Sequence, residues 1–172
     1  MKVDNQRYPI GQFELPAAIT AREIQQWVED IETLPVRLKE ATADLTEEQL
    51  AATYREGSWT VRQLVHHMAD SHLHLFIRCK LALTEENPMV KIFDENRWIL
   101  LADSDMPIES SLSILDGLHS RGVELFRSLS EGGVSLTFSH PETGAASIAE
   151  TIAKWAWHGN HHLAHIENAI RA

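Results

Sequence analysis

Histidines are the residues of this sequence best suited to chemistry, and they crowd into two short windows. The chain has ten histidines, and eight of them lie within residues 66–74 and 158–165. Imidazole nitrogens bind divalent metals such as zinc, nickel, iron and copper, so the two windows predict a metal site. The second window is interleaved with apolar residues and is followed by Ile166 and Ile170, which excludes a purification tag.

The second window offers two His-x-x-x-His pairs, His158 with His162 and His161 with His165. Side chains four residues apart lie on the same face of a helix and can share a metal ion. At about 100° per residue, His162 lies about 40° from His158 and borders the apolar stripe, whereas His161 lies about 60° to the other side. Helical geometry therefore favours His158 and His162 as metal ligands and predicts that His161 faces solvent.

A metal site needs at least one more protein ligand, and the first window is the expected donor. His72 falls within the apolar stripe of its helix, His67 lies at the border of that stripe, and His66 points away from it. Periodicity ranks His67 and His72 about equally, so both candidates stay open on this evidence. We expect His66 and His74 to be solvated surface residues.

The helices that carry these windows can be located by their N-terminal capping boxes. Four Ser or Thr residues are followed three positions later by Glu or Gln, namely Thr20 with Glu23, Thr46 with Gln49, Thr60 with Gln63, and Ser147 with Glu150. We predict long helices from Thr20, with a break or kink at Pro35, over residues 60–84, over 109–129, and from Ser147 nearly to the end. Shorter helices are expected over 47–53 and 95–101, and an extended piece over 134–138.

These elements predict an all-α fold, a four-helix bundle with short extra helices and an extended N-terminal arm. At 172 residues, the chain is expected to form a single metal-binding helical domain, residues 1–172. The net charge of −10 argues against nucleic-acid binding, which relies on Lys and Arg, and no apolar stretch reaches the roughly 20 residues of a membrane span. A single cysteine and an N-terminus without a secretory signal favour the cytoplasm.

Residues 58–70 resemble the DinB/YfiT-like superfamily of metal-binding four-helix bundles. Members of that superfamily have a tryptophan followed by Ser or Thr at the start of the second helix, and a ligand histidine eight residues after the tryptophan. Trp59 plus eight is His67. The other two ligands of the superfamily form a His-x-x-x-His pair on the last helix, which matches His158 and His162. The resemblance therefore implies a ligand set of His67, His158 and His162.

The resemblance covers nearly the whole chain and is strongest toward the YfiT-like branch, which looks like the bacillithiol transferases and is also described as metal-dependent hydrolases. Further shared segments include Tyr8-Pro9-Ile10-Gly11, Tyr54-Arg55-Glu56-Gly57, His140-Pro141 and Trp157-His158. We expect a divalent metal, Zn²⁺ first with Ni²⁺ as the alternative in recombinant material, and the branch implies a homodimer. The broader superfamily often has Gly-Gln after its final ligand, where this chain has Leu163-Ala164-His165, which leaves the roles of His161 and His165 open.

Each of the other polar residues of the two windows has two possible structural roles. His72 and His165 are expected to be either hydrogen-bonded core histidines or partners that orient the ligands or the substrate. Asp70 is either such a partner or an ordinary polar helix position. The alternative for the three ligand candidates is a polar cluster that is hydrogen-bonded inside the bundle without a metal. Cys79 lies on an apolar stripe and is expected to be an inert small hydrophobe.

Three neutral imidazoles leave the double charge of a metal uncompensated and leave coordination positions open. Such a centre can bind a thiol as its reactive thiolate, or lower the pKa of a bound water toward about 7. We identify no separate catalytic residue in the sequence. The leading prediction is a metal-dependent thiol S-transferase, in which a low-molecular-weight thiol, bacillithiol in the resembled branch, attacks an electrophilic small molecule as the metal-bound thiolate.

Two alternatives come from other functional classes. The first is a metal-dependent hydrolase of a small ester or amide that uses a metal-bound hydroxide. It is weakened because no Glu lies between His158 and His162 to act as a general base. The second is a non-enzymatic metal-binding stress protein, which is expected if turnover is found neither with nor without a thiol.

Overall fold

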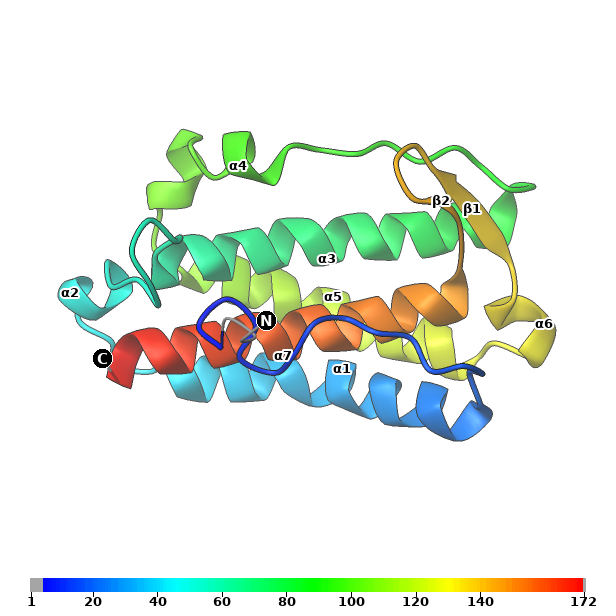
Figure 1. Ribbon diagram of the computed structural model, residues 1–172, viewed down its shortest axis with the longest axis horizontal. Coiled ribbons are helices and arrows are strands. Elements are labelled where there is room, and N and C mark those ends of the chain that lie inside the picture. The colour runs from blue at the N-terminus through cyan, green and yellow to red at the C-terminus, as the bar shows by residue number, and fades with distance from the viewer. Residues whose placement is uncertain (1–4, 172) are drawn as a thin grey trace.

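The computed structural model describes residues 5–171, and four long helices dominate it. They lie side by side along the long axis of the molecule (Figure 1) and are α1 (Ala21–Thr42), α3 (Val61–Thr84), α5 (Glu109–Arg127) and α7 (Ile148–Arg171). Helices α7 and α5 each pack against both α1 and α3. The predicted all-α four-helix bundle is therefore confirmed.

Shorter elements connect the long helices at the two ends of the bundle. They are α2 (Glu47–Leu50), α4 (Glu95–Trp98), the 3₁₀ helix η1 (Ala102–Asp105), α6 (Glu131–Val134), β1 (Thr137–His140) and β2 (Gly144–Ser147). The two strands form an antiparallel hairpin that leads into α7. The extended piece predicted over 134–138 therefore begins later, at Thr137. The N-terminal arm runs without regular structure along α7 to α1 (Figure 1).

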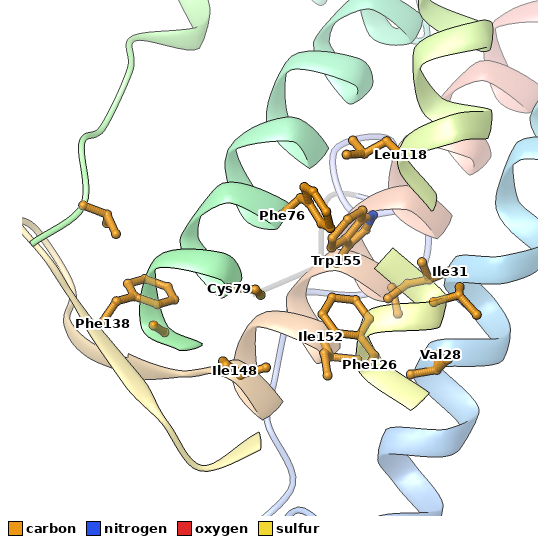
Figure 2. Close-up of a cluster of buried hydrophobic side chains, with 14 residues drawn as sticks. Val28, Ile31, Phe76, Cys79, Leu118, Phe126, Phe138, Ile148, Ile152 and Trp155 are labelled. Atoms are coloured by element: carbon orange, nitrogen blue, oxygen red, sulfur yellow. The ribbon is translucent and has the colours of Figure 1, made fainter. Parts of the chain in front are cut away.

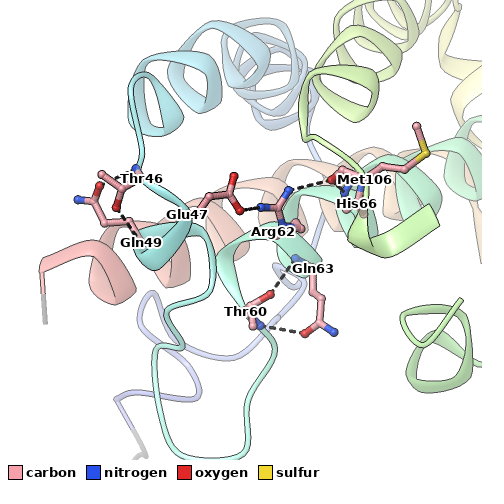
Figure 3. A network of polar contacts seen from close by, with 8 residues as sticks. All are labelled: Thr46, Glu47, Gln49, Thr60, Arg62, Gln63, His66 and Met106. Carbon is pink, nitrogen blue, oxygen red and sulfur yellow. Dashed lines mark hydrogen bonds and ion pairs between the residues drawn. The ribbon is translucent and has the colours of Figure 1, made fainter. Parts of the chain in front are cut away.

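All four capping boxes form, and they fix where the helices begin. The side chains of Thr20, Thr46 and Thr60 each accept a hydrogen bond from the backbone three residues later, and the partner side chain reaches back to the cap. Ser147 makes the same exchange with Glu150. Figure 3 shows the boxes at Thr46 and Thr60. Because the Thr60 box sets the first turn of α3, it also sets where His67 lies along the bundle.

The break predicted at Pro35 is absent, because α1 continues through this residue to Thr42. Proline has no backbone N–H, so the carbonyl of Ile31, four residues earlier, has no helical donor. The Nδ1 atom of His119, on α5, lies 2.6 Å from that carbonyl and takes the place of the missing donor. A tertiary hydrogen bond thus compensates the proline inside the helix.

Two apolar clusters fill the bundle, and the histidines lie between them. One cluster centres on Trp155 and includes Phe76, Phe126 and Ile152 (Figure 2). The other includes Leu38, Leu64, Met68, Leu163 and Ile166. Along α3 and α7 the histidine windows lie where the residues of one cluster give way to those of the other. Within residues 5–171, no helix is both long enough and apolar enough to cross a membrane.

Candidate metal centre

The structure brings together the three histidines that the resemblance implies. His67 on α3 faces His158 and His162 on α7, and one ring nitrogen of each lies within 4.8 Å of the others. The Nε2 atoms of His67 and His158 are 3.2 Å apart. Nitrogens bound to a tetrahedral zinc at about 2.0–2.1 Å lie about 3.3 Å from one another. The donor set therefore fits a divalent metal such as zinc.

Burial keeps these imidazoles neutral. It lowers the pKa of His67 to about 4, and it lowers the pKa values of His158 and His162 well below the usual range, with the neighbouring histidines adding to the effect. Neutral imidazole has the free lone pair that metal binding requires. The Ser71 hydroxyl lies 3.4 Å from both ring nitrogens of His67. Among the hydrogen bonds of residues 5–171, none joins a carboxylate to a ring of this triad.

His72 contacts a ligand candidate rather than forming part of the triad. Its Nε2 atom lies 3.1 Å from Nδ1 of His158, and its Nδ1 atom lies 2.9 Å from Nε2 of His119. Trp155 Nε1 donates to the same Nε2 of His119 at 3.2 Å. Of the two readings of His72, the geometry favours a partner that orients His158. His119 was missed in the sequence because it lies alone, outside both windows.

His165 plays a similar part for His162. The Nδ1 atoms of the two rings are 3.3 Å apart, and Nε2 of His165 lies 3.2 Å from the backbone carbonyl of Arg7. The ring of His165 also stacks on Tyr54, with 3.8 Å between centroids. His161, His162 and His165 form a second group with nitrogens close enough to share an ion. Because Nε2 of His165 contacts the Arg7 carbonyl, His165 could offer a metal in this second group only its Nδ1 atom.

The prediction that His66 is a solvated surface residue is wrong. Its side chain is buried, with Nδ1 at 2.7 Å from Ser111 Oγ and Nε2 at 3.0 Å from the carbonyl of Met106. Figure 3 shows this contact beside Arg62, which bonds to the same carbonyl. The segment that enters α5 covers the face of α3 that periodicity assigned to solvent.

His161 and His74 are also less exposed than predicted. His161 is buried and stacks on Trp157 with 4.4 Å between ring centroids, while Tyr8 of the N-terminal arm lies 6.1 Å away. His74 is half-buried and stacks on Phe93 at 4.3 Å. Helical periodicity describes the side of each helix that faces the bundle, and it gives no sign of the arm and loop that cover the outer faces.

Asp70 and Cys79 lie outside the candidate site. Asp70 is half-buried, and burial together with the nearby Asp103 raises the pKa of its carboxyl group. Asp70 is not among the residues that line the cavity at the triad. Cys79 is fully buried, and burial raises the pKa of its thiol to about 12. A thiol that stays protonated is unreactive, in agreement with the expected inert hydrophobe.

A cavity of about 550 Å³ opens onto the triad and is rich in cationic side chains. Its walls include the basic residues Arg7, Arg55, Arg78 and Lys154, against the two acidic residues Glu95 and Glu142. The sequence reasoning missed these basic residues, although Arg55 lies in a segment shared with the YfiT-like branch. Their spacing along the chain gives no signal that they converge.

Unpartnered polar atoms belong to residues that line the same cavity. In the part of the chain that the structure describes, four buried side-chain atoms have no hydrogen-bond partner: Arg55 Nε, Arg78 Nε, Trp157 Nε1 and His161 Nδ1. All four of these residues line the cavity. Buried polar groups in proteins are normally satisfied, so four unpartnered atoms in residues of one cavity mark it as a candidate ligand site.

Comparisons with known proteins agree with this geometry. A protein of Oceanobacillus iheyensis is 51% identical over 97% of both chains, and one of Halalkalibacterium halodurans is 48% identical over 98% of both. Each carries the name "Putative metal-dependent hydrolase". The structure of YfiT from Bacillus subtilis, described as "a probable metal-dependent hydrolase with an unusual four-helix bundle topology", matches with a TM-score of 0.93 at 39% identity, over 97% of both chains.

The sequence profile of the DinB superfamily matches residues 30–166, which include both histidine windows and the whole of α3 and α5. The chain therefore belongs to the DinB superfamily, with the fold of YfiT.

Proposed function

We propose that this protein is a metal-dependent thiol S-transferase, with a divalent metal, zinc in our proposal, held by His67, His158 and His162. The observation that carries the proposal is the position of the triad. Its three neutral imidazoles open onto a cavity of about 550 Å³, a volume within the range that small-molecule ligands occupy. A metal site that only stabilised the fold would be closed by a fourth protein ligand.

A metal bound at this site supplies a Lewis acid that favours the deprotonated form of a thiol. The protein residues bind and orient the reactants. Arg55 and Arg78 line the cavity, and their guanidinium groups suit the carboxylates of a thiol such as bacillithiol. The thiol proton leaves to solvent, the sulfur forms a bond to carbon of the electrophile, and the leaving group departs with the electron pair of the broken bond.

Hydrolysis of a small ester or amide is the second candidate, and the names of the relatives favour it. The same neutral triad would then serve to activate water. The triad has no hydrogen bond to a carboxylate base among residues 5–171. We therefore rank hydrolysis below transfer, since a thiol activated by a metal needs no such base.

One experiment separates the two candidates. Protein purified without a polyhistidine tag is loaded with zinc, and consumption of 1-chloro-2,4-dinitrobenzene is followed with bacillithiol, with cysteine, and without a thiol. Hydrolysis of 4-nitrophenyl acetate is followed in parallel without a thiol. We expect zinc-dependent consumption only when a thiol is present. Ester turnover without a thiol would support the hydrolase, and the absence of turnover in both assays would support a non-enzymatic role.

We also propose that the protein forms a homodimer. Large apolar side chains are exposed on the outer face of α3 and in the segment that follows it, including Leu73 at 42% exposure, Ile77 at 45% and Leu100 at 78%. Exposed apolar surface of this kind favours association with another protein surface. Sedimentation of the wild type beside Ile77→Glu tests the proposal, because a monomeric wild type would refute it.

A further inference from the structure

The hydrogen bonds that lead from α1 to His158 run in a single direction, which can be worked out atom by atom. Pro35 leaves the carbonyl of Ile31 without a helical donor, and Nδ1 of His119 lies 2.6 Å from that oxygen. A carbonyl oxygen can only accept. His119 must therefore carry a proton on Nδ1.

The second nitrogen of His119 must then be an acceptor. Burial lowers the pKa of His119 to about 4, so the ring is neutral at pH 7 and has one donor and one acceptor. Trp155 gives an independent check, because its Nε1–H can only donate and lies 3.2 Å from Nε2 of His119. The remaining neighbour of Nε2 is Nδ1 of His72, at 2.9 Å. His72 therefore donates from Nδ1.

His72 connects His119 to the metal-ligand candidate His158. His72 is fully buried, and its described hydrogen-bond partners are both imidazoles, so it is neutral. Since Nδ1 of His72 donates, its Nε2 accepts from Nδ1 of His158, at 3.1 Å. The Nε2 atom of His158 is then left without a proton, and this is the atom that lies 3.2 Å from Nε2 of His67.

We propose that Pro35, His119 and His72 form a positioning relay that holds His158 in the one tautomer able to bind a metal through Nε2. The relay takes one group from each long helix, since Ile31 is on α1, His119 on α5, His72 on α3 and His158 on α7. It rests on the proposed metal centre and holds whether the enzyme transfers a thiol or hydrolyses an ester. The relay gives both Pro35 in α1 and His119 in α5 a role in holding the tautomer of His158.

The relay also predicts what its loss would do. Without the acceptor at His119, His72 is free to carry its proton on Nε2 and to donate it toward Nδ1 of His158. The proton of His158 would then move to Nε2 and block the metal position. Mutation of a residue that hydrogen-bonds to a metal ligand typically lowers metal affinity by about 10–100-fold.

The test compares His119→Phe with a matched control, His66→Phe, which removes another buried histidine of the bundle whose hydrogen bonds lead to Ser111 and Met106. Zinc dissociation constants are measured by competition with a chelator. Histidine tautomers are read from two-bond ¹H–¹⁵N spectra of the metal-free, ¹⁵N-histidine-labelled protein. We expect the wild type and His66→Phe to show the Nδ1–H form of His158, and His119→Phe to lose it and to bind zinc about 10–100-fold more weakly.

Pro35→Ala is the second variant, and it tests the relay even if His119→Phe fails to fold. It returns an N–H to the Ile31 carbonyl, in competition with His119, and it also replaces proline by a better helix former. We expect zinc affinity to fall several-fold while stability against urea is kept or raised. A merely structural role of Pro35 would move both quantities together. An unchanged His158 tautomer and unchanged zinc affinity in either folded variant would overturn the relay.

Discussion

His158 and His161 form a pair that distinguishes the two histidine groups able to hold a metal, because each belongs to a different group while His162 belongs to both. We predict that His158→Ala lowers the zinc content of untagged protein at least tenfold, whereas His161→Ala leaves it unchanged. Elemental analysis of the purified variants measures both. The reverse pattern would move the metal to His161, His162 and His165.

Buried neutral histidines also predict how stability depends on pH. The pKa values of His67 and His119 are lowered to about 4, below the usual value near 6.5. In that interval the unfolded chain binds protons that the folded chain does not, so stability falls as pH falls. Above about pH 6.5 both states are neutral and the effect is absent. Each of the two histidines lowers the free energy of unfolding by at most about 3 kcal/mol when the pH falls from about 6.5 to 4.

Urea unfolding of the metal-free protein between pH 4 and 8 measures this dependence. His119→Gln, which has no titrating ring, should flatten the slope between about pH 6.5 and 4 relative to the wild type. A slope that is unchanged by this substitution would show that His119 is not held neutral by its surroundings.

At the scale of elements, the close approach of α1 and α7 places His158 beside the relay. Gly159 allows this approach, because a Cβ there would lie 2.3 Å from Cδ2 of Leu34 and 3.4 Å from Cε1 of His72. We predict that Gly159→Ala costs about 1–3 kcal/mol of stability and also weakens zinc binding. Chemical denaturation and chelator competition measure the two effects.

Gly117→Ala is the matched control, because Gly117 is also helical and a Cβ there would meet nothing within 4 Å. Alanine at this position is expected to raise stability by up to about 1 kcal/mol. If Gly159→Ala behaved in the same way, the contact between α1 and α7 would not be as tight as the structure indicates.

The helices could be predicted from sequence because their signals are local. Each capping box lies within a few turns of the apolar residues that mark the same helix. The His158 and His162 pair likewise follows from helical spacing. His67 needed the family resemblance, because periodicity alone does not separate it from His72. The partner that compensates Pro35 is His119, 84 residues further along the chain in the printed sequence. No local pattern carries a contact of that kind.

At the scale of the whole molecule, the charge of the cavity opposes the charge of the chain. The protein has a net charge of −10, yet its cavity includes Arg7, Arg55, Arg78 and Lys154 against Glu95 and Glu142. A cleft with an excess of one sign of charge concentrates ligands of the opposite sign.

This arrangement predicts selectivity among thiols by charge. Arg55→Gln and Arg78→Gln each remove a cation whose Nε atom has no partner in the described chain, so binding of mercaptosuccinate, a dicarboxylate thiol, should weaken about tenfold as charge-assisted hydrogen bonds are lost. Binding of uncharged 2-mercaptoethanol should not change. Arg127→Gln is the control, because Arg127 pairs with Glu32 on the surface. Calorimetry on the zinc-loaded proteins measures each affinity. In the wild type, the affinity for mercaptosuccinate should fall with added salt, because the attraction is electrostatic. Equal losses for both thiols would place the two arginines in the structural support of the cavity rather than in contact with the anionic end of the substrate.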